Sequence, residues 1–218
     1  MENRLFIKRL VVGGLSANCF IVGDEAGTEG MVIDPGGNPE RILPAIAASG
    51  FDIKIIVLTH GHSDHIAALY EIQDQTGAEV AIHVEDADFL EGSGSYSSQF
   101  GISYRTPHPP DRTLREGDEI TVGNTTYQVI HTPGHTPGSI CLLTAGKVFT
   151  GDTIFHRGIG TTMMPGSSRP QLLHSIQTRL MTLPDDTAIY PGHGRETTIG
   201  TERRDNPYVN GRRKNSYW

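Results

Sequence analysis

Residues 53–72 read IKIIVLTHGHSDHIAALYEI, and this stretch decides the fold of the chain. The apolar run from Ile53 to Leu58 is short and rich in β-branched residues, so it predicts a buried strand. Apolar residues then recur at helical spacing from Ile66 to Ile72, and Gly77 marks the end of the predicted helix. A strand, a polar loop and a helix in this order are typical of an α/β arrangement.

The polar loop between this strand and helix carries four candidate metal ligands within six positions: His60, His62, Asp64 and His65. In an extended loop the residues at 60, 62 and 64 project to one side, and the turn into the helix can bring residue 65 to the same centre. A solvent-exposed loop with chance histidines is the alternative, but it does not explain this density of ligands. Imidazole and carboxylate without thiolate suit Zn²⁺, Fe²⁺ or Mn²⁺, which leaves the identity of the metal open.

The segment before this stretch predicts an opening sheet and then a helix. Strand-like runs separated by glycine-containing turns indicate an antiparallel meander, and they cover Leu5 to Val12, Cys19 to Val22 and Gly30 to Asp34. Asn38 is predicted to cap a helix that begins at Pro39 and ends before Gly50.

The remainder of the chain predicts further strands and one more helix. A long loop without periodicity, from Gly92 to Pro110, is expected near the substrate entrance. Residues from Thr113 to Val129 predict a hairpin centred on Gly123 and Asn124. Other strands are expected at Glu79 to His83, Ser139 to Leu143, Val148 to Thr150 and Ala188 to Tyr190, and a helix at Gln171 to Leu183.

Three further segments share one design, in which an apolar strand delivers a polar residue beside a glycine. They are PGHTPG at 133–138, TGDT at 150–153 and YPGHG at 190–194, and they contribute His135, Asp152 and His193. Each of these segments alone is an ordinary turn. Together with the loop at 60–65, however, they supply enough ligands for two coordination spheres.

At this point the chain resembles a known family. The HxHxDH loop, the PGHTPG turn, the TGD turn and the PGHG ending are similar to the metallo-β-lactamase superfamily, and the match spans nearly the whole chain. The order and length most resemble glyoxalase II, and more closely its short relatives without the C-terminal helical domain. The resemblance implies an α/β (α+β) fold, specifically a four-layer αββα sandwich. We expect a single domain over residues 1–218 with a basic C-terminal tail from about residue 203.

The resemblance also implies two divalent metal ions per chain, with zinc as the first choice and iron or manganese as alternatives. Carried over position by position, the first ion lies on His60, His62 and His135, the second on Asp64, His65 and His193, and Asp152 bridges them.

This implied site predicts a hydrolase that uses a metal-bridging hydroxide. The hydroxide would attack an acyl carbon, and the resemblance favours a thioester of the hydroxyacylglutathione type. Asp64 and Asp152 are the expected catalytic residues, and the Asp64 carboxylate would orient the hydroxide or accept its proton. Asp34 would hold the ligand loop through hydrogen bonds, with the capping of a turn as its alternative role.

Two departures from glyoxalase II affect the expected substrate. The Gly-Arg-Thr/Ser-Asp stretch that follows the bridging aspartate in that family is replaced here by GIGTTMM at 158–164. The chain is also too short for the extra domain that contributes glutathione-binding residues, so glutathione specificity does not transfer. Arg157, Arg203 and Arg204 are the substitutes that the sequence offers, although ordinary surface arginines are the alternative.

Other reactions on the same scaffold compete with the hydrolase. A persulfide dioxygenase needs one Fe²⁺ on two histidines and an aspartate, which His60, His135 and Asp152 can supply. The Pro191-Gly192-His193-Gly194 ending favours the hydrolase, because it resembles glyoxalase II more than the dioxygenases. A lactonase is a further alternative, whereas a closed metal-stabilised binding module does not fit ligands placed on an open rim.

Composition sets limits on the partners. The formal net charge of −7 over 218 residues argues against an enzyme that binds nucleic acid through phosphate contacts. No apolar run is long enough for a membrane span, and the isolated cysteines indicate buried free thiols in a cytoplasmic protein. The small acyl or thioester substrate that the resemblance implies is compatible with these limits. The basic segment from Arg203 to Lys214 could receive an anionic group, with a solvated tail as the alternative.

Overall fold

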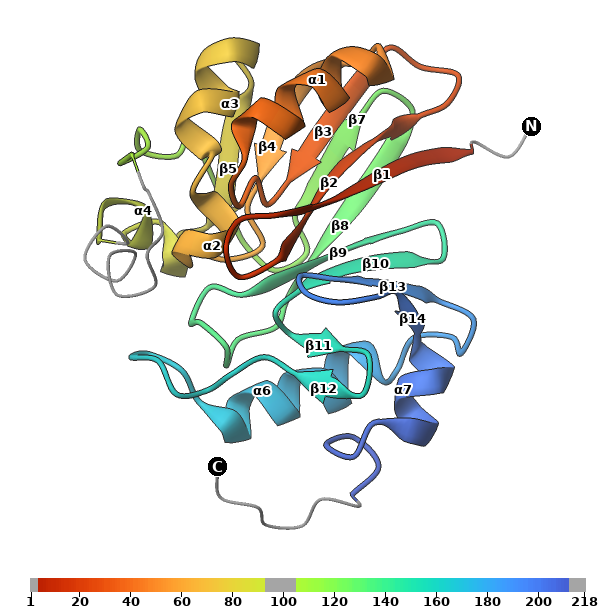
Figure 1. Cartoon of the computed structure of the whole chain (residues 1–218). Coiled ribbons are helices and arrows are strands. Elements are labelled where there is room, and N and C mark those ends of the chain that lie inside the picture. The colour runs from red at the N-terminus through yellow and green to blue at the C-terminus, as the bar shows by residue number, and fades with distance from the viewer. Residues whose placement is uncertain (1–3, 93–104, 212–218) are drawn as a thin grey trace.

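Two β-sheets packed face to face form the centre of the molecule, and helices cover both outer faces (Figure 1). The computed structural model describes residues 4–92 and 105–211. Within these residues the main strands form two six-stranded sheets, accompanied by a small two-stranded one.

The first sheet begins with the predicted antiparallel meander and continues with parallel strands. Its spatial order is β1 (Leu5–Val12), β2 (Ala17–Asp24), β3 (Glu29–Ile33), β4 (Asp52–Val57), β5 (Glu79–His83) and β6 (Arg112–Leu114). Strands β1 to β3 pair antiparallel, and β3 to β6 pair parallel. The parallel strands end at one edge of the sheet, and the ligand loop follows β4 at that edge.

The second sheet has the spatial order β14-β13-β10-β9-β8-β7. Its strands are β7 (Glu119–Val122), β8 (Thr125–His131), β9 (Ile140–Thr144), β10 (Lys147–Gly151), β13 (Ala188–Pro191) and β14 (Thr197–Thr198), and the small sheet pairs β11 (Ile154–Phe155) with β12 (Gly158–Ile159). The predicted turn at Gly123 and Asn124 joins β7 to β8, but the predicted start of this hairpin is wrong. Thr113 belongs to β6 and pairs with Ile82 in the first sheet.

Helix α1 (Pro39–Ser49) has the predicted bounds, and Gly50 ends it in the left-handed conformation. Asn38 occupies the N-cap position, but its side chain makes no capping hydrogen bond. Its Oδ1 instead accepts from the backbone of Gly13 at 2.8 Å, and its Nδ2 donates to Glu40 at 2.9 Å. Asn38 therefore ties the first hairpin to the start of α1.

The two other predicted helices are interrupted. The helix expected from Ile66 to Gly77 consists of α2 (Ser63–Ile66) and α3 (Leu69–Thr76), because the Ala68 amide donates to Pro35 outside the helix at 2.9 Å. The later helix is α6 (Arg169–Ser175) continued by the π-helical segment η3 (Ile176–Leu180).

The remaining helices correct the expected tail. They are the 3-10 turn η1 (Val84–Asp86), α4 (Phe89–Gly92) and α7 (Ile199–Asp205). Arg203 and Arg204 lie in α7, so the basic segment begins within a folded helix rather than a tail. Residues 93–104 of the expected entrance loop and residues 212–218 of the expected tail lie outside the described residues.

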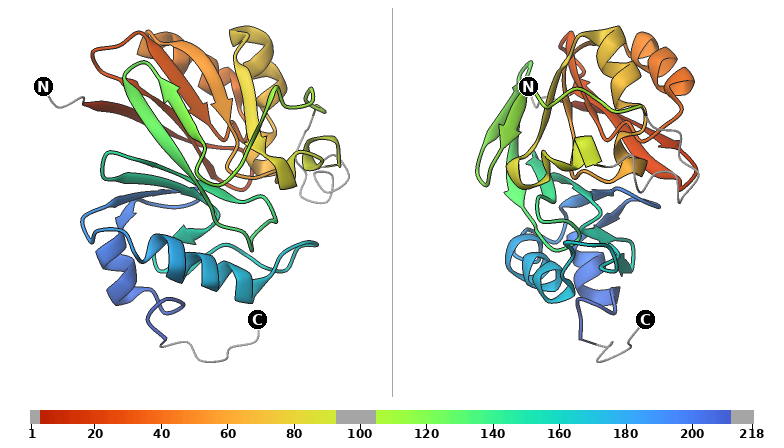
Figure 2. Two further views of the ribbon diagram at one scale, coloured as in Figure 1. Left: turned by 180° about the vertical axis from the view of Figure 1, so that it is seen from behind. Right: turned by 90° about the vertical axis from the view of Figure 1, so that its left-hand side faces the viewer.

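Hydrophobic clusters between successive layers establish the αββα sandwich. One joins α1 and α3 to the first sheet, one fills the space between the sheets, and one joins the second sheet to α6, η3 and α7. Phe20 and Phe149 meet edge to face across the central layer at 5.2 Å. Each large apolar side chain buried in this way contributes roughly 1.5–3 kcal/mol. Figure 2 shows the two outer helical layers on opposite sides of the sheets.

No helix among residues 4–92 and 105–211 is long and apolar enough to cross a membrane. Cys19 in β2 and Cys141 in β9 are buried and unpaired, as predicted.

Candidate metal centre

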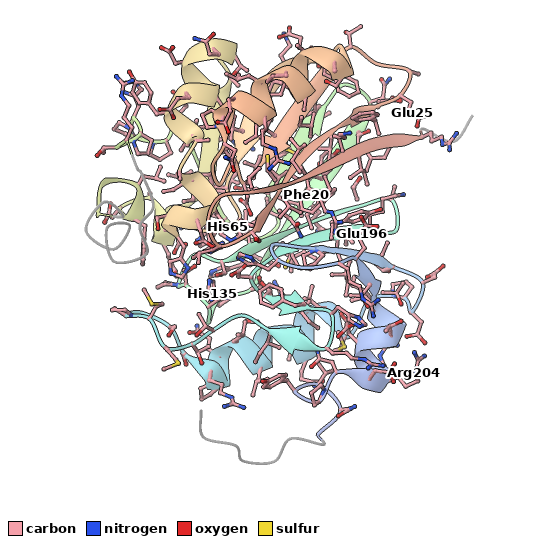
Figure 3. All side chains as sticks on the ribbon, in the orientation of Figure 1. Phe20, Glu25, His65, His135, Glu196 and Arg204 are labelled. Carbon is pink, nitrogen blue, oxygen red and sulfur yellow. The ribbon has the colours of Figure 1, made fainter. Side chains whose placement is uncertain are left out.

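All seven predicted ligands meet at one edge of the sandwich. The loop after β4 and helix α2 supply residues 60–65, and the turns after β8, β10 and β13 supply His135, Asp152 and His193. Figure 3 shows His65 and His135 at this edge, one from each half of the molecule. Strand ends thus converge from both sheets, as the sequence predicted.

His60, His62 and His135 form the first group of donors. His62 Nδ1 lies 2.8 Å from His135 Nε2, which lies 3.3 Å from His60 Nε2. Burial, followed by the neighbouring histidines, holds the pKa of His60 well below its ordinary value and lowers the pKa of His62 to about 4. The imidazoles of His60 and His62 are therefore neutral near pH 7, the form that coordinates a metal.

Asp64, His65 and His193 form the second group. His65 Nε2 and His193 Nε2 are 3.2 Å apart, and Asp64 Oδ2 lies 3.2 Å from His193 Nε2 and 3.6 Å from His65 Nε2. Burial alone would raise the pKa of Asp64, but His65 and His193 hold it below its ordinary value. Ligand atoms of each group lie within 4.8 Å of one another, close enough to share an ion.

Asp152 stands between the two groups. Its Oδ1 lies 3.3 Å from His65 Nε2, and its Oδ2 lies 3.5 Å from His135 Nε2 and 3.6 Å from His193 Nε2. Burial would raise the pKa of Asp152, but these histidines hold it far below its ordinary range. The buried Oδ1 accepts no hydrogen bond from a described residue. A carboxylate in contact with both groups and with an oxygen lacking a donor fits a position between two cations.

Asp34 orients the ligand loop from behind. It accepts hydrogen bonds from Thr59 N at 2.7 Å, Thr59 Oγ1 at 2.6 Å and His65 Nδ1 at 3.0 Å. The contact between Nδ1 and Asp34 directs Nε2 of His65 toward the cluster of donors. The interpretation of Asp34 as a support for the loop, made from the resemblance, agrees with these contacts.

Asp86 is a supporting residue that sequence reasoning missed. Wholly buried in η1, it accepts from Gly61 N at 2.9 Å, Gly138 N at 2.6 Å and Thr136 Oγ1 at 2.7 Å. It therefore joins the ligand loop to the PGHTPG turn. The sequence offers no signal that separates Asp86 from its exposed neighbour Glu85.

Comparison with known proteins places this geometry in a family. The sequence profile of the Metallo-beta-lactamase superfamily matches residues 12–193. The chain belongs to this superfamily. A hydroxyacylglutathione hydrolase, GloC from Haemophilus influenzae, is 36% identical, and the alignment covers 94% of this chain and 98% of the relative.

Solved structures of other superfamily members have the same fold. TTHA1623, crystallised in a di-iron-bound form, is 33% identical with a TM-score of 0.84, and 92% of this chain and 99% of that chain are covered. ETHE1 from Myxococcus xanthus is also 33% identical, with a TM-score of 0.81 over 94% of this chain and 85% of that one.

In this superfamily member Asn18 fixes the His193 turn. The Asn18 amide N–H donates to Gly192 O at 2.7 Å, and its Nδ2 donates to Pro191 O at 2.8 Å and Gly194 O at 2.9 Å. Strand β2 of the first sheet thus holds the turn at 191–194, which follows β13 of the second sheet and carries His193. The sequence near Asn18 does not predict this contact, because the hydrogen-bond partners of the Asn18 side chain lie more than 170 positions away.

Glycine is required at two turns because of close approaches. Gly151 has a φ of +46°, and a Cβ there would lie 2.3 Å from Thr59 Oγ1. A Cβ on Gly192 would lie 2.3 Å from Asp152 Oδ1. The TGD and PGHG glycines therefore let the turns approach the cluster closely enough to deliver Asp152 and His193.

A third group of donors, His83, Glu85 and His131, lies apart from this site. The rings of His83 and His131 are stacked at 4.0 Å with an interplanar angle of 16°. A metal ligated by imidazole lies in the ring plane, and two parallel stacked planes cannot contain the same ion. His131 Nε2 also bonds to Pro137 O at 2.8 Å. These contacts indicate a structural role for both histidines.

Proposed function

We propose that this chain is a binuclear metal-dependent hydrolase that cleaves a thioester of the hydroxyacylglutathione type. The observation that carries the proposal is the position of Asp152, whose two carboxylate oxygens face histidines of both donor groups at 3.3–3.6 Å. The donor set combines imidazoles with carboxylates and has no thiolate, which suits two divalent ions.

The proposed assignment of ligands divides the cluster into three parts. One ion would be held by His60, His62 and His135, the other by Asp64, His65 and His193, and both by Asp152. Two such ions, when bound, supply a hydroxide nucleophile near neutral pH and a Lewis acid for the acyl oxygen. We propose zinc as the metal, with iron and manganese as alternatives; the di-iron form of TTHA1623 supports iron.

The protein's own groups handle the proton and the substrate. The Asp64 side chain is 15% exposed, so its carboxylate is within reach of a water molecule at the open edge. Because its lowered pKa keeps it ionised near pH 7, it can orient a nucleophilic water and accept its proton. A departing thiolate is a stable anion, so no general acid is required on the opposite side.

The similarity to GloC from Haemophilus influenzae supports a small-molecule thioester as the substrate. We also propose a cytoplasmic location, because the buried free thiols of Cys19 and Cys141 fit a reducing compartment.

Hydrolysis of S-lactoylglutathione by the zinc-loaded protein tests this proposal. We expect thioester cleavage, and a decrease in kcat of about 100-fold or more in Asp64→Asn, which keeps the shape of the side chain and removes its basicity. Glu85→Gln, a matched change at an exposed acid, should retain the rate. Absence of cleavage by the wild-type protein, or equal rates in Asp64→Asn and wild type, would overturn the proposal.

A mononuclear-iron persulfide dioxygenase is the second candidate, and the similarity to ETHE1 favours it. Here His60, His135 and Asp152 would hold a single Fe²⁺, since Asp152 Oδ2 lies 3.5 Å from His135 Nε2 and the two histidines are 3.3 Å apart. Oxygen uptake with glutathione persulfide by the iron-loaded protein decides between the candidates. Uptake without thioester cleavage would establish the dioxygenase in place of the hydrolase.

A further inference from the structure

Arg195 is a cation at the edge of the candidate metal centre, and its partner is a histidine instead of an acid. It follows the ligand His193 by two positions, and its side chain is exposed. Its guanidinium NH2 lies 2.6 Å from His156 Nε2. No described carboxylate lies within ion-pair distance of Arg195, and Arg195 is not among the residues with further unspecified contacts.

The arginines that the sequence offered as anion receptors are engaged elsewhere. Arg157 pairs with Asp205 at 3.6 Å, and Arg204 pairs with the same carboxylate at 3.0 Å. Arg203 forms an ion pair with Asp185 and donates to the carbonyls of residues 181 and 183. Of these four arginines, Arg195 is therefore the one whose guanidinium is not paired with a described carboxylate.

A buried support fixes the histidine that holds Arg195. A guanidinium can only donate, so His156 Nε2 must accept and the ring proton must lie on Nδ1. That nitrogen lies 3.3 Å from Glu202 Oε1, whose side chain is 0% exposed. Glu202 also accepts from Arg157 N at 2.7 Å and Thr197 Oγ1 at 2.6 Å. Helix α7 thus locks the hairpin β11–β12 and with it the ring of His156.

The same hairpin also contacts the candidate metal centre. Phe155, next to His156, packs edge to face against His193 with ring centroids 5.8 Å apart. The hairpin begins at Ile154, two residues after Asp152, and leads to Thr161, whose carbonyl accepts from His135 Nδ1 at 2.8 Å. The hairpin next to the histidine that holds Arg195 is therefore in contact with a histidine of each donor group.

We propose that Arg195, held by His156 and Glu202, binds a carboxylate of the thioester substrate. This inference rests on the proposed thioesterase function and adds a specificity-determining residue to it. A planar guanidinium with its remaining N–H donors exposed suits a carboxylate, which accepts two parallel hydrogen bonds. The substrate class is then an anionic thioester with its carboxylate several bonds away from the acyl carbon, on either the thiol or the acyl side.

The test uses pairs of thioesters that differ only in carboxylate against primary amide. One pair carries the difference on the thiol, as S-lactoyl-3-mercaptopropionate and its amide. The other carries it on the acyl group, as the glutaryl and glutaramoyl thioesters of 3-mercaptopropanamide. Rates are measured with the zinc-loaded wild type, Arg195→Ala and the control Arg157→Ala. Arg157 follows His156 directly in the sequence, but its guanidinium pairs with Asp205.

The wild type should prefer the carboxylate member of at least one pair by about tenfold in kcat/KM, through KM, because the contact is equal in ground and transition states. Arg195→Ala should abolish this preference and keep the rate on the amide, while Arg157→Ala should keep the preference. No preference in the wild type, or an equal preference in Arg195→Ala, would overturn the inference.

A binding measurement separates this inference from the proposed function. If no thioester is cleaved, the thioesterase proposal fails, and NMR titration of the zinc-loaded proteins with 3-(methylthio)propionate and its amide decides the role of Arg195. Tighter binding of the acid than of the amide, lost in Arg195→Ala, supports the inference. Identical titrations of wild type and Arg195→Ala contradict it.

Discussion

Asp86 connects the loop at 60–65 to the PGHTPG turn at 133–138. Its carboxylate accepts hydrogen bonds from the backbone of Gly61 and Gly138 and from Thr136. Asp86→Ala would leave these buried donors without an acceptor, and we expect it to lower the free energy of unfolding by about 3 kcal/mol or more. Urea unfolding measures this change. The control Glu85→Ala removes an exposed acid and should stay within about 0.5 kcal/mol, and an equal loss in both variants would contradict the role given to Asp86.

The histidines of the candidate metal centre make the stability of the metal-free protein depend on pH. The lowered pKa values of His60 and His62 mean that the unfolded chain binds more protons below its ordinary histidine pKa of about 6.5. Stability is therefore lost as the pH falls below that value, and the lowered pKa of Asp152 extends the loss below about pH 4.

On the alkaline side the sign is opposite. Burial would lower the pKa values of His65 and His193, but the carboxylates of Asp64 and Asp152 raise both. Their stabilisation is complete below about pH 6.5 and is lost as the pH rises through the raised values. We therefore expect the urea midpoint of the metal-free protein, prepared with a chelator, to be highest near pH 6.5. A midpoint that rises steadily from about pH 5 to about pH 9 would contradict this account.

At the scale of elements, the PGHTPG turn is placed by its contact with α6. Gly134 has a φ of +136°, and a Cβ there would lie 2.2 Å from Leu172 N in α6. Gly134→Ala must therefore displace the helix or the turn that carries His135. We expect a loss of more than about 3 kcal/mol in unfolding free energy and weaker zinc binding, measured by urea unfolding and competition with a chelator.

Gly146→Ala is the matched control, because Gly146 also has a positive φ, +72°, but open space around the added Cβ. Backbone strain alone should cost about 1–2 kcal/mol and leave zinc binding unchanged. Equal effects of the two substitutions would show that contact with α6 does not position the turn.

Local patterns predicted the elements better than their connections. The apolar run of β4 and the glycine after α1 are local signals that depend on only a few residues. The bounds of β4 and α1 were therefore predicted closely. The assignment of Thr113 failed because β6 and β7 are both short strand-like runs, and only pairing with Ile82 distinguishes them. The break before α3 depends on the carbonyl of Pro35, more than 30 positions away, so no helical periodicity shows it.

At the scale of the whole molecule, the donors of the candidate site could be predicted from the sequence, whereas the residues that support them could not. The cluster of donors was predictable because the loop at 60–65 and the three later turns each contain a glycine and each follow an apolar strand, and such strand ends meet at the edges of the sheets. The supports Asn18 and Asp86 were not, because their importance lies in partners brought near only by the packing of the two sheets. The role of Arg195 was likewise unpredictable, because it depends on contacts with His156 and, through His156, with Glu202, which belong to different elements.

The packing of the whole sandwich also controls the reactivity of the cysteines. Burial raises the pKa of Cys141 to about 11 and raises that of Cys19 further. We expect neither thiol to react with a thiol-specific reagent in the native protein faster than the molecule unfolds. In denaturant both cysteines of the chain should react at once, which serves as the control. Rapid labelling under native conditions would contradict the burial of these strands.

The metal content of the purified protein tests the central claim, a two-metal site built by residues of both sheets around Asp152. Elemental mass spectrometry of the wild type and of Asp152→Ala, each with its S-lactoylglutathione hydrolysis rate, gives the answer directly. Two metal ions per chain in the wild type, with fewer ions and no hydrolysis in Asp152→Ala, is the result that this account predicts. One ion per chain in the wild type, unchanged in Asp152→Ala, would contradict it.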